Sequence, residues 1–471
     1  MKLALVGPTN KLDDTSYDAQ RTVNLIPERS ETGTSKEPDR LISAPGYVLF
    51  ATAGGGPIRG EITTAGGRNF QVSGSTFYEL SSTGTATSRG TLNTAIGRCS
   101  LAENGSQIMI VDGTNGYIFT MSTNDFSQIA DAQFPNGATI CAFMDTYFLA
   151  NDPGTGDFYI SDNNDGTSWA ALDKTSVESS PDNLVSLLPD HGELILPGTY
   201  TTEFYYNASA SDPSGFPFKR KQEGVMQVGC AAAHTLKSFN NNVMWLAQTR
   251  DGGRFIARIN QSGVRHEKVS PKWLDQLLEG LDDVSDAYAF TYKQDGHDYY
   301  VLQVPGLFTT PVFDAATERW HERVYFNAVL NREERWRASG FSYFDGNHLI
   351  GDRDSGAVYE LSPDYYDDNG EEIHRIRILS HVSQEMQSMT LSEVILDMET
   401  GVGDTDEPQV MLSVSKDGGR NYGNERWRGF GKLGNYRALV RWLRFGQAKV
   451  WTFKIRITAN KKISLHGFYI N

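Results

Sequence analysis

The segment SVSKDGGRNYG, residues 413–423, carries side chains at a spacing found in sugar-cleaving proteins. Its pattern Ser415-x-Asp417-x-Gly419-x-x-Tyr422 is close to the Asp box, a β-hairpin turn, with Tyr where Trp is usual. Such a turn needs an Asp that accepts backbone N–H groups, a Gly at positive φ and an aromatic ring packed beneath. We therefore interpret Ser415, Asp417, Gly419 and Tyr422 as a structural turn, with a sugar enzyme as the alternative.

The rest of the chain contains few signals of catalysis. A glycosidase needs two carboxylates beside the scissile bond, and a sialidase-type site also needs an arginine cluster and a Tyr–Glu pair. No such set is marked among the 58 Asp and Glu residues, and a second degenerate box, NDGTSW at 164–169, lacks the usual Asp. DNNDG at 162–166 resembles a calcium loop, but its Gly stands at the fifth-ligand position, so it predicts a tight turn. HExxH, GxSxG and a phosphate loop are missing, so we expect no enzyme, no metal and no cofactor.

Charge is distributed unevenly along the chain. Residues 413–471 hold 13 Lys or Arg against two acids, a charge of +11 on a chain whose total is −15, which leaves −26 for the other 412 residues. A basic segment can contact nucleic acid or dock on an acidic subunit. Docking is favoured because the basic residues alternate with aromatic residues, as in an ordered strand. The predicted subunit or adaptor interface consists of Arg426, Arg428, Arg437, Arg441, Arg444, Lys454 and Arg456.

The composition favours an all-β globular protein. The 471 residues include 46 Gly, 24 Phe and 21 Tyr, which suits many turns and many half-buried strands. The three cysteines (Cys99, Cys141 and Cys230) lie far apart and are expected to be reduced and partly buried. MKLALVGPTNK is too short in its apolar run for a secretory signal, and no apolar run approaches the length of a membrane span.

Residues 46–365 repeat one motif: a strand, a turn with Gly or Asn, and a strand that carries an aromatic residue. It occurs in SGSTFYEL (73–80), TNGYIFTM (114–121), TGDFYISD (155–162) and SGAVYEL (355–361), and the first three lie about 40 residues apart. Several strands per 40–50-residue unit are typical of a β-propeller blade. The sequence therefore predicts a β-propeller of about six to seven blades, with the aromatic residues between the blades.

Three further segments flank or interrupt the predicted propeller. Residues 1–45 predict an extended N-terminal arm with little core of its own, which either clips onto a neighbour or completes a blade. One isolated helix is expected near 270–284, with Ser270 as cap, Pro271 at the first helical position and one apolar stripe lying on the propeller.

An acidic linker at 362–372 precedes a basic C-terminal β domain at 373–471. Within it, KVWTFKIRIT (449–458) predicts a half-buried strand, whereas YRALVRWLRF (436–445) suits a helix or a strand.

The order of several segments resembles the packaged-DNA stabilisation, or tail-hub (tail accessory, nozzle), proteins of short-tailed bacteriophages. The similarity runs over most of the chain. The matching segments are YDAQRTVNLIPE, SAPGYVLF, GELILPGTYTTEFYYNAS, EGVMQVGCAAAHT, the helix from Ser270, QDGHDYYVLQVP, VFDAATERWHER, LSVSKDGGRNYG, RWLRFG and FKIRIT.

The resemblance implies a structural protein of the virion tail, assembled in the host cytoplasm. It implies a homo-oligomeric ring, expected to be a hexamer, below the portal and its adaptor proteins, which retains packaged DNA and provides the DNA ejection channel. The expected partners are other copies of the chain, portal-adaptor proteins, a tail needle or tip, receptor-binding tailspikes or fibres, and phage DNA that passes without sequence-specific binding. A carbohydrate-binding or glycosidase-like β-propeller and a non-phage scaffold propeller are the alternatives.

Overall fold

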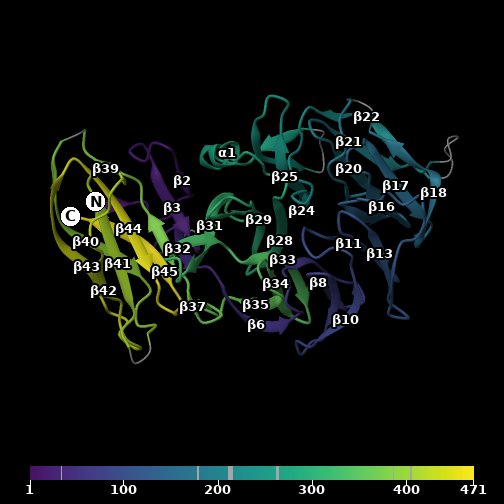
Figure 1. The fold of residues 1–471 in the computed structure, drawn as a ribbon. Coiled ribbons are helices and arrows are strands. Elements are labelled where there is room, and N and C mark those ends of the chain that lie inside the picture. Colours follow the sequence, from purple (N-terminus) through teal and green to yellow (C-terminus); the bar gives the residue numbers. More distant parts are fainter. Residues whose placement is uncertain (33, 178–179, 210–215, 261–264, 386, 404–405) are drawn as a thin grey trace.

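The computed structural model describes all residues except 33, 178–179, 210–215, 261–264, 386 and 404–405. Figure 1 shows two bodies joined side by side: a propeller, and a C-terminal sandwich that contains both chain termini. The described residues form 45 strands and one α-helix, so the prediction of an all-β fold with an isolated helix is confirmed.

Seven sheets of the propeller surround one axis, and we number them as blades in chain order. The first three blades are regular antiparallel meanders, and each pairs its strands in chain order. Blade 1 contains β7 (Ile58–Thr63), β8 (Asn69–Ser73), β9 (Thr76–Leu80) and β10 (Ala86–Thr91). Blade 2 contains β11 (Ser100–Glu103), β12 (Gln107–Val111), β13 (Gly116–Thr120) and β14 (Asp125–Gln128). Blade 3 contains β15 (Cys141–Met144), β16 (Tyr147–Asn151), β17 (Asp157–Asp162) and β18 (Asp165–Ser176).

The next three blades keep this order with small variations. Blade 4 contains β19 (Leu188–Asp190), β20 (Glu193–Pro197), β21 (Thr202–Asn207) and β22 (Phe218–Met226). In blade 5 the inner position is shared by β23 (Gly229–Cys230) and β24 (Lys237–Phe239), followed by β25 (Asn242–Gln248), β26 (Arg254–Asn260) and β27 (His266–Lys268). Blade 6 contains β28 (Tyr288–Gln294), β29 (His297–Gln303), β30 (Thr310–Asp314) and β31 (Arg319–Asn327), and β32 (Arg332–Arg335) pairs with β31.

Blade 7 closes the ring with a strand from the other end of the propeller. It contains β33 (Ala338–Phe344), β34 (Asn347–Asp352) and β35 (Ala357–Ser362), and its outer strand is β6 (Gly46–Thr52). Because β6 directly precedes blade 1 in the chain, its backbone hydrogen bonds with β35 hold the start of the propeller to its last blade. The blade count of seven lies within the predicted range of six to seven.

The repeated motif corresponds to one position in the blade. SGSTFYEL, TNGYIFTM, TGDFYISD and SGAVYEL contain β9, β13, β17 and β35, and each of these is the third strand from the axis. Aromatic and aliphatic side chains fill every space between adjacent blades, for example Phe70, Phe77 and Phe119 between blades 1 and 2. Sheets that pack face to face need such a layer to exclude water.

The single helix is shorter than predicted. Helix α1 spans Lys272–Glu279, and Pro271 takes the N-cap position with extended backbone. The prediction that Ser270 caps the helix is wrong: its hydroxyl accepts a hydrogen bond from the Ile256 amide at 3.0 Å and donates to Asp275 at 2.5 Å. The apolar stripe does bury Trp273, Leu274 and Leu278 against the core between blades 5 and 6.

The C-terminal sandwich consists of two sheets that enclose an apolar core. One sheet has the order β4-β5-β45-β40-β43 with β1 beside β45, and the other continues from blade 6 through β3-β38-β44-β41-β42. Strands from the first 45 residues are β1 (Lys2–Leu3), β2 (Asn10–Lys11), β3 (Ala19–Val23), β4 (Leu25–Arg29) and β5 (Asp39–Ser43). The others are β38 (Arg375–Ile378), β39 (Val382–Ser383), β40 (Met389–Met398), β41 (Gln409–Ser415), β42 (Arg426–Gly429), β43 (Val440–Ala448), β44 (Val450–Ile457) and β45 (Ser464–Ile470). Strands β36 (Asp367–Asp368) and β37 (Glu371–Glu372) lie in the predicted linker and extend the sheet of blade 7.

Residues 1–45 therefore pair with the C-terminal strands of their own chain. Leu3, Leu5, Leu25 and Leu41 are buried in the core of the sandwich. Strand β3 pairs with β31 of blade 6 on one side and with β38 on the other, so the blade continues into the sandwich as one sheet. This connection fixes the sandwich beside blade 6.

Candidate functional site

The predicted basic interface lies at one edge of the sandwich, where β42 and β43 end the two sheets. Among the strands that the structure describes, β42 pairs only with β41 and β43 pairs only with β40, so both are edge strands. Arg426 Nη2 donates to the Leu443 carbonyl, and Arg428 Nε donates to the Arg441 carbonyl at 2.9 Å. These two arginines connect the edges of the two sheets and cover backbone acceptors that would otherwise be open to pairing.

Arg441 and Arg444 lie on β43 with exposed side chains. Arg441 makes one loose ion pair with Glu393 at 3.6 Å, and within the described part of the chain Arg444 makes none. Arg444 has positive φ (66°), and the register of β43 against β40 shifts at this point. The strand bulges there, so two arginines three residues apart both reach solvent, whereas in a regular strand they would point to opposite faces.

The remaining predicted interface residues have different surroundings. Arg437 is exposed in the loop between β42 and β43. Arg456 on β44 forms a bidentate pair with Glu425 at 2.7 and 2.6 Å. Lys454 is partly buried 5.8 Å above the Tyr422 ring, and burial lowers its pKa. Five of the seven predicted residues thus belong to the segment 426–444, and the other two lie on β44, which is separated from β42 by β41.

The same segment exposes apolar side chains that the sequence interpretation did not single out. Trp427 is 51% exposed, Tyr436 72% and Leu439 58%. Leu433 and Leu443 are also exposed. Aromatic residues and arginine are enriched at protein interfaces, and lysine is depleted there. The alternation in RWLRF (441–445) indicates that Leu443 is exposed, because Arg441 and Leu443 share one face of the strand while Trp442 is buried on the other.

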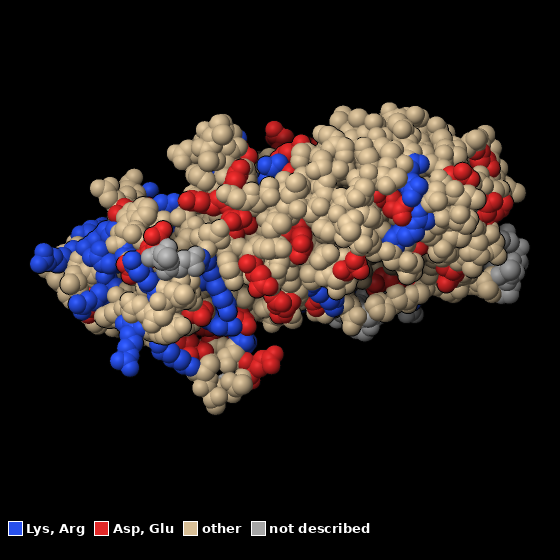
Figure 2. Space-filling view, turned by 90° about the horizontal axis from the view of Figure 1, so that it is seen from below, with Lys and Arg blue, Asp and Glu red and all other residues tan. Residues whose placement is uncertain are grey.

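Figure 2 shows how the charges are distributed over one face of the molecule. Lys and Arg gather over the C-terminal sandwich, and Asp and Glu are spread across the middle of the molecule. On this face, the sequence-based contrast between a basic C-terminal segment and an acidic remainder corresponds to two regions. A surface with separated charge can orient copies of itself or a charged partner.

The turn at 415–422 is held by a dense set of short hydrogen bonds. Ser415 Oγ donates to Asp417 Oδ1 at 2.6 Å and accepts from the Gly419 amide at 2.9 Å. Asp417 accepts from the backbone and the side chain of Asn421. These bonds hold the pKa of the Asp417 carboxyl below its ordinary value. Gly419 has φ of 81°, and Tyr422 packs against a small apolar cluster between sandwich and blade 6.

The propeller–sandwich junction is polar and paired. Asn24, at φ 51°, donates to the carbonyls of Val324 and His374, each at 3.0 Å, and accepts from the Val324 amide. The buried Arg377 on β38 donates to the Leu5 carbonyl at 2.6 Å and to Thr22 Oγ1 at 2.9 Å. These bonds tie the arm to both bodies, so the sandwich and the propeller are held together by specific contacts.

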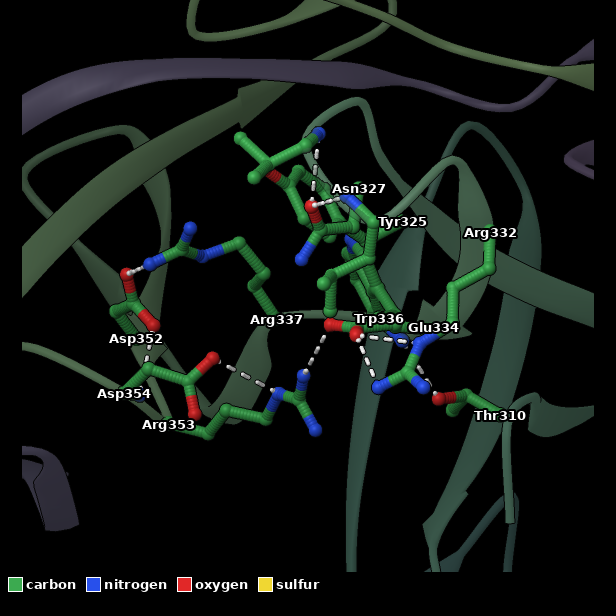
Figure 3. A network of polar contacts seen from close by, with 12 residues as sticks. Thr310, Tyr325, Asn327, Arg332, Glu334, Trp336, Arg337, Asp352, Arg353 and Asp354 are labelled. Atoms are coloured by element: carbon green, nitrogen blue, oxygen red, sulfur yellow. Dashed lines mark hydrogen bonds and ion pairs between the residues drawn. The ribbon is translucent and has the colours of Figure 1, made fainter.

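A second polar network anchors blade 7 beside blade 6, as seen in Figure 3. Glu334 accepts two hydrogen bonds from Arg332 and lies 3.9 Å from Arg353. Arg337 pairs with the buried Asp352 at 2.6 Å, and its guanidinium lies 5.3 Å from the centre of the Tyr325 ring. The charged groups of this network are paired with one another, as expected of structural contacts.

The described residues show no metal cluster that could serve as a catalytic centre. They contain no group of three or more His, Cys, Asp or Glu side chains placed to hold a metal ion. The residues of DNNDG instead form the β17–β18 hairpin, with Asn164 at φ 55° and Asp162 opposite Asp165. In the part of the chain that the structure describes, no helix is long and apolar enough to cross a membrane.

Comparison with known proteins gives two matches that together cover almost the whole chain. Residues 1–366 match the family model described as Bacteriophage P22 Gp10, beta-propeller. Residues 374–471 match the model described as Bacteriophage P22 Gp10, beta-sandwich. No curated protein matches the chain.

Solved structures show a distant similarity in shape. One is the extracellular domain of the putative one component system BT4673 from B. thetaiotaomicron, with 9% identity and a TM-score of 0.45 over 84% of this chain and 48% of that one. Another is PorZ, a surface component of the type-IX secretion system of Porphyromonas gingivalis, with 9% identity and a TM-score of 0.39 over 75% of this chain and 45% of that one. The chain spans about half the length of these structures.

Proposed function

Because the chain belongs to the family of bacteriophage P22 Gp10, a family of tail proteins that stabilise packaged DNA, we propose that it forms a ring below the portal of a short phage tail. In this role it retains packaged DNA, provides the ejection channel and binds a tail needle or tip and receptor-binding spikes. The observation that carries the proposal is the match of both bodies, in chain order, to the two models of one family. The ring number we propose is six.

The DNA channel of this assembly lies between subunits. The axis of each propeller holds a cavity of only about 370 Å³, crossed by the side chain of Arg98, which lies 4.4 Å from the centre of the Tyr288 ring. A duplex cannot enter such a space. Several copies must therefore surround the DNA together.

The charge distribution supports this arrangement. Acidic walls repel phosphate, whereas a bore lined with lysine would bind DNA and slow it. The acidic remainder of the chain is suited to face the channel. The basic edge of β42 and β43, with its exposed Trp427 and Leu443, is suited to contact a neighbouring subunit or an adaptor protein.

Light scattering of the purified protein, followed by negative-stain imaging, tests the proposal. We expect a ring with a central hole wide enough for a duplex, formed either alone or on addition of the adaptor. A protein that remains monomeric with and without the adaptor would contradict the proposal. Virions assembled without the protein should lose their packaged DNA.

A further inference from the structure

The propeller axis contains a cavity of about 370 Å³ that all seven blades line. Glu61 of blade 1, Lys237 of blade 5 and Phe290 of blade 6 are among its wall residues, together with Arg98 and His234 from the loops that precede inner strands. Ligand sites in proteins usually measure about 300–1,000 Å³. The cavity therefore has room for a ligand about the size of a monosaccharide.

The charged groups in this cavity form few hydrogen bonds with the described residues. The two carboxylate oxygens of Glu61 and the Nε of Arg98 have no hydrogen-bond partner among the described residues. Arg98 makes one long contact to the Ile58 carbonyl at 3.5 Å and lies 4.4 Å from the centre of the Tyr288 ring, so it has no carboxylate in hydrogen-bond contact. Among the described residues, Lys237 Nζ has neither an ion pair nor a hydrogen bond. This contrasts with the blade 6–7 network, where Arg337 and Arg353 both face carboxylates.

The titration behaviour of these groups leaves the cavity cationic near neutral pH. Burial lowers the pKa of Lys237 to about 8 and that of His234 to about 3, so the lysine stays mostly charged and the imidazole is neutral. Burial raises the pKa of Glu61 to about 7, so its negative charge is only partly present. Two cations thus face, at most, one carboxylate.

The site is rigidly built around Arg98. The buried Arg59 donates to the carbonyls of Thr94, Ile96 and Gly97 at 2.8, 2.6 and 2.7 Å, which holds the loop that presents Arg98. Glu61 lies so close to β33 that a Cβ at Gly340 would be 1.9 Å from its Oε1. A pre-organised set of donors loses little entropy when a ligand binds.

Unpaired cations in an enclosed space are costly, and a bound anion offsets that cost. We propose that the propeller axis is a binding site for a small oxyanion, the carboxylate or phosphate group of a ligand no larger than a monosaccharide. Arg98 supplies a planar pair of donors and Lys237 a point charge. The aromatic walls Phe143, Phe290 and Phe341 contact the apolar part of the ligand.

Calorimetric titration of the intact protein tests this site. The probes are inorganic phosphate, glucuronate and, as an uncharged control, glucose. We expect phosphate, glucuronate or both to bind in the micromolar to millimolar range and glucose not to bind. Binding of phosphate alone would identify the ligand group as a phosphate, and binding of glucuronate alone would identify it as a carboxylate.

The variant Lys237→Gln is expected to weaken anion binding at least tenfold. Lys293→Gln is the matched control, because Lys293 is exposed on blade 6 outside the cavity. The acetylation rate of Lys237 in the unmodified protein, measured by mass spectrometry, gives a readout that does not depend on the folding of a variant. It should fall several-fold in saturating anion. Equal binding by the wild type and Lys237→Gln, no binding of either anion, or no protection of Lys237 would overturn the proposal.

Discussion

Arg21 of β3 and Glu322 of β31 form a bidentate pair at the place where the propeller sheet continues into the sandwich. Arg21 Nε lies 3.0 Å from Glu322 Oε1, and Arg21 Nη2 lies 2.7 Å from Oε2. Glu333 lies 3.1 Å from the same guanidinium. Burial opposes ionisation of Glu322, but the charge and hydrogen bonds of Arg21 prevail and hold the pKa of the carboxyl below its ordinary value.

Removing the charge of Glu322 should loosen this junction. In Glu322→Gln, the partly buried Arg21 keeps only Glu333 as a charged partner, and breaking a buried pair typically costs about 3–5 kcal/mol. Because Glu333 remains, we expect the free energy of unfolding, measured by chemical denaturation, to fall by the lower end of this range, about 3 kcal/mol. Glu318→Gln, at an exposed position of the β30–β31 turn, is the control and should change stability by less than about 0.5 kcal/mol. Equal stability of the two variants would show that the pair does not hold the junction.

Acid should weaken the same contact. A carboxyl whose pKa is lowered in the folded state contributes stability above its unfolded pKa, and that contribution is lost as pH falls through the folded value. The ordinary pKa of Glu is 4.5, and that of Glu322 lies below it. The unfolding midpoint of the wild type should therefore fall progressively below about pH 4.5. Glu322→Gln should show a flatter decline over the same range, and parallel curves would exclude Glu322 as a contributor.

This junction could not be predicted from the sequence. The segment before residue 46 has polar residues, four prolines and short apolar runs, which indicate an extended arm but not its partner. The pairing of β3 with β31 and β38 depends on residues far away in the chain, and no local pattern encodes it. The repeated strand–turn–aromatic motif was a better guide, because each blade uses its third strand in the same way and so repeats the same local requirements.

The basic edge illustrates a second limit. RWLRF has arginines three residues apart, a spacing that suits a helix, and the strand accommodates it only through the bulge at Arg444. The basic character of the segment was evident from composition. Most of its exposed apolar residues were not, because Leu433, Tyr436 and Leu439 lie in the loop before β43, where no strand alternation marks which side chains are exposed.

Charge reversal on this edge should block assembly without unfolding the subunit. Arg441 and Arg444 are exposed, so Arg441→Glu and Arg444→Glu should each change stability by less than about 0.5 kcal/mol. A contact with an acidic surface would become repulsive, and light scattering should find the variants smaller than the wild-type assembly under identical conditions.

Lys293→Glu is the control for these reversals, because it makes the same charge change on the propeller. It should assemble as the wild type does. Normal rings from both Arg441→Glu and Arg444→Glu would refute the placement of the interface on β43. Trp427→Ser should also reduce assembly if the apolar residues of the segment belong to the same contact.

The three cysteines should resist alkylation in the folded protein. Cys99, Cys141 and Cys230 are free and buried, and burial raises the pKa of the first two to about 12 and of the third to about 11. The reactive thiolate is therefore scarce at neutral pH. Iodoacetamide labelling followed by mass spectrometry should modify all three in denaturant and none in native buffer within the same time. Rapid labelling of any one in native buffer would indicate local opening of the blade that holds it.

A substitution in the turn at 415–422 can distinguish a structural role of the Asp-box pattern from a sugar-binding role. Ser415 is buried, and its hydroxyl bonds both Asp417 and the Gly419 amide, so Ser415→Ala should destabilise the sandwich by about 1–2 kcal/mol. Ser16→Ala, in an exposed arm turn where serine likewise bonds an aspartate, is the control and should have a smaller effect. Thermal unfolding measures the difference, and glycan-array binding provides the second readout. If the pattern is a structural turn, Ser415→Ala lowers the melting temperature and leaves the glycan profile unchanged. A glycan that the wild type binds and Ser415→Ala loses, at unchanged stability, would instead place a sugar site at this hairpin.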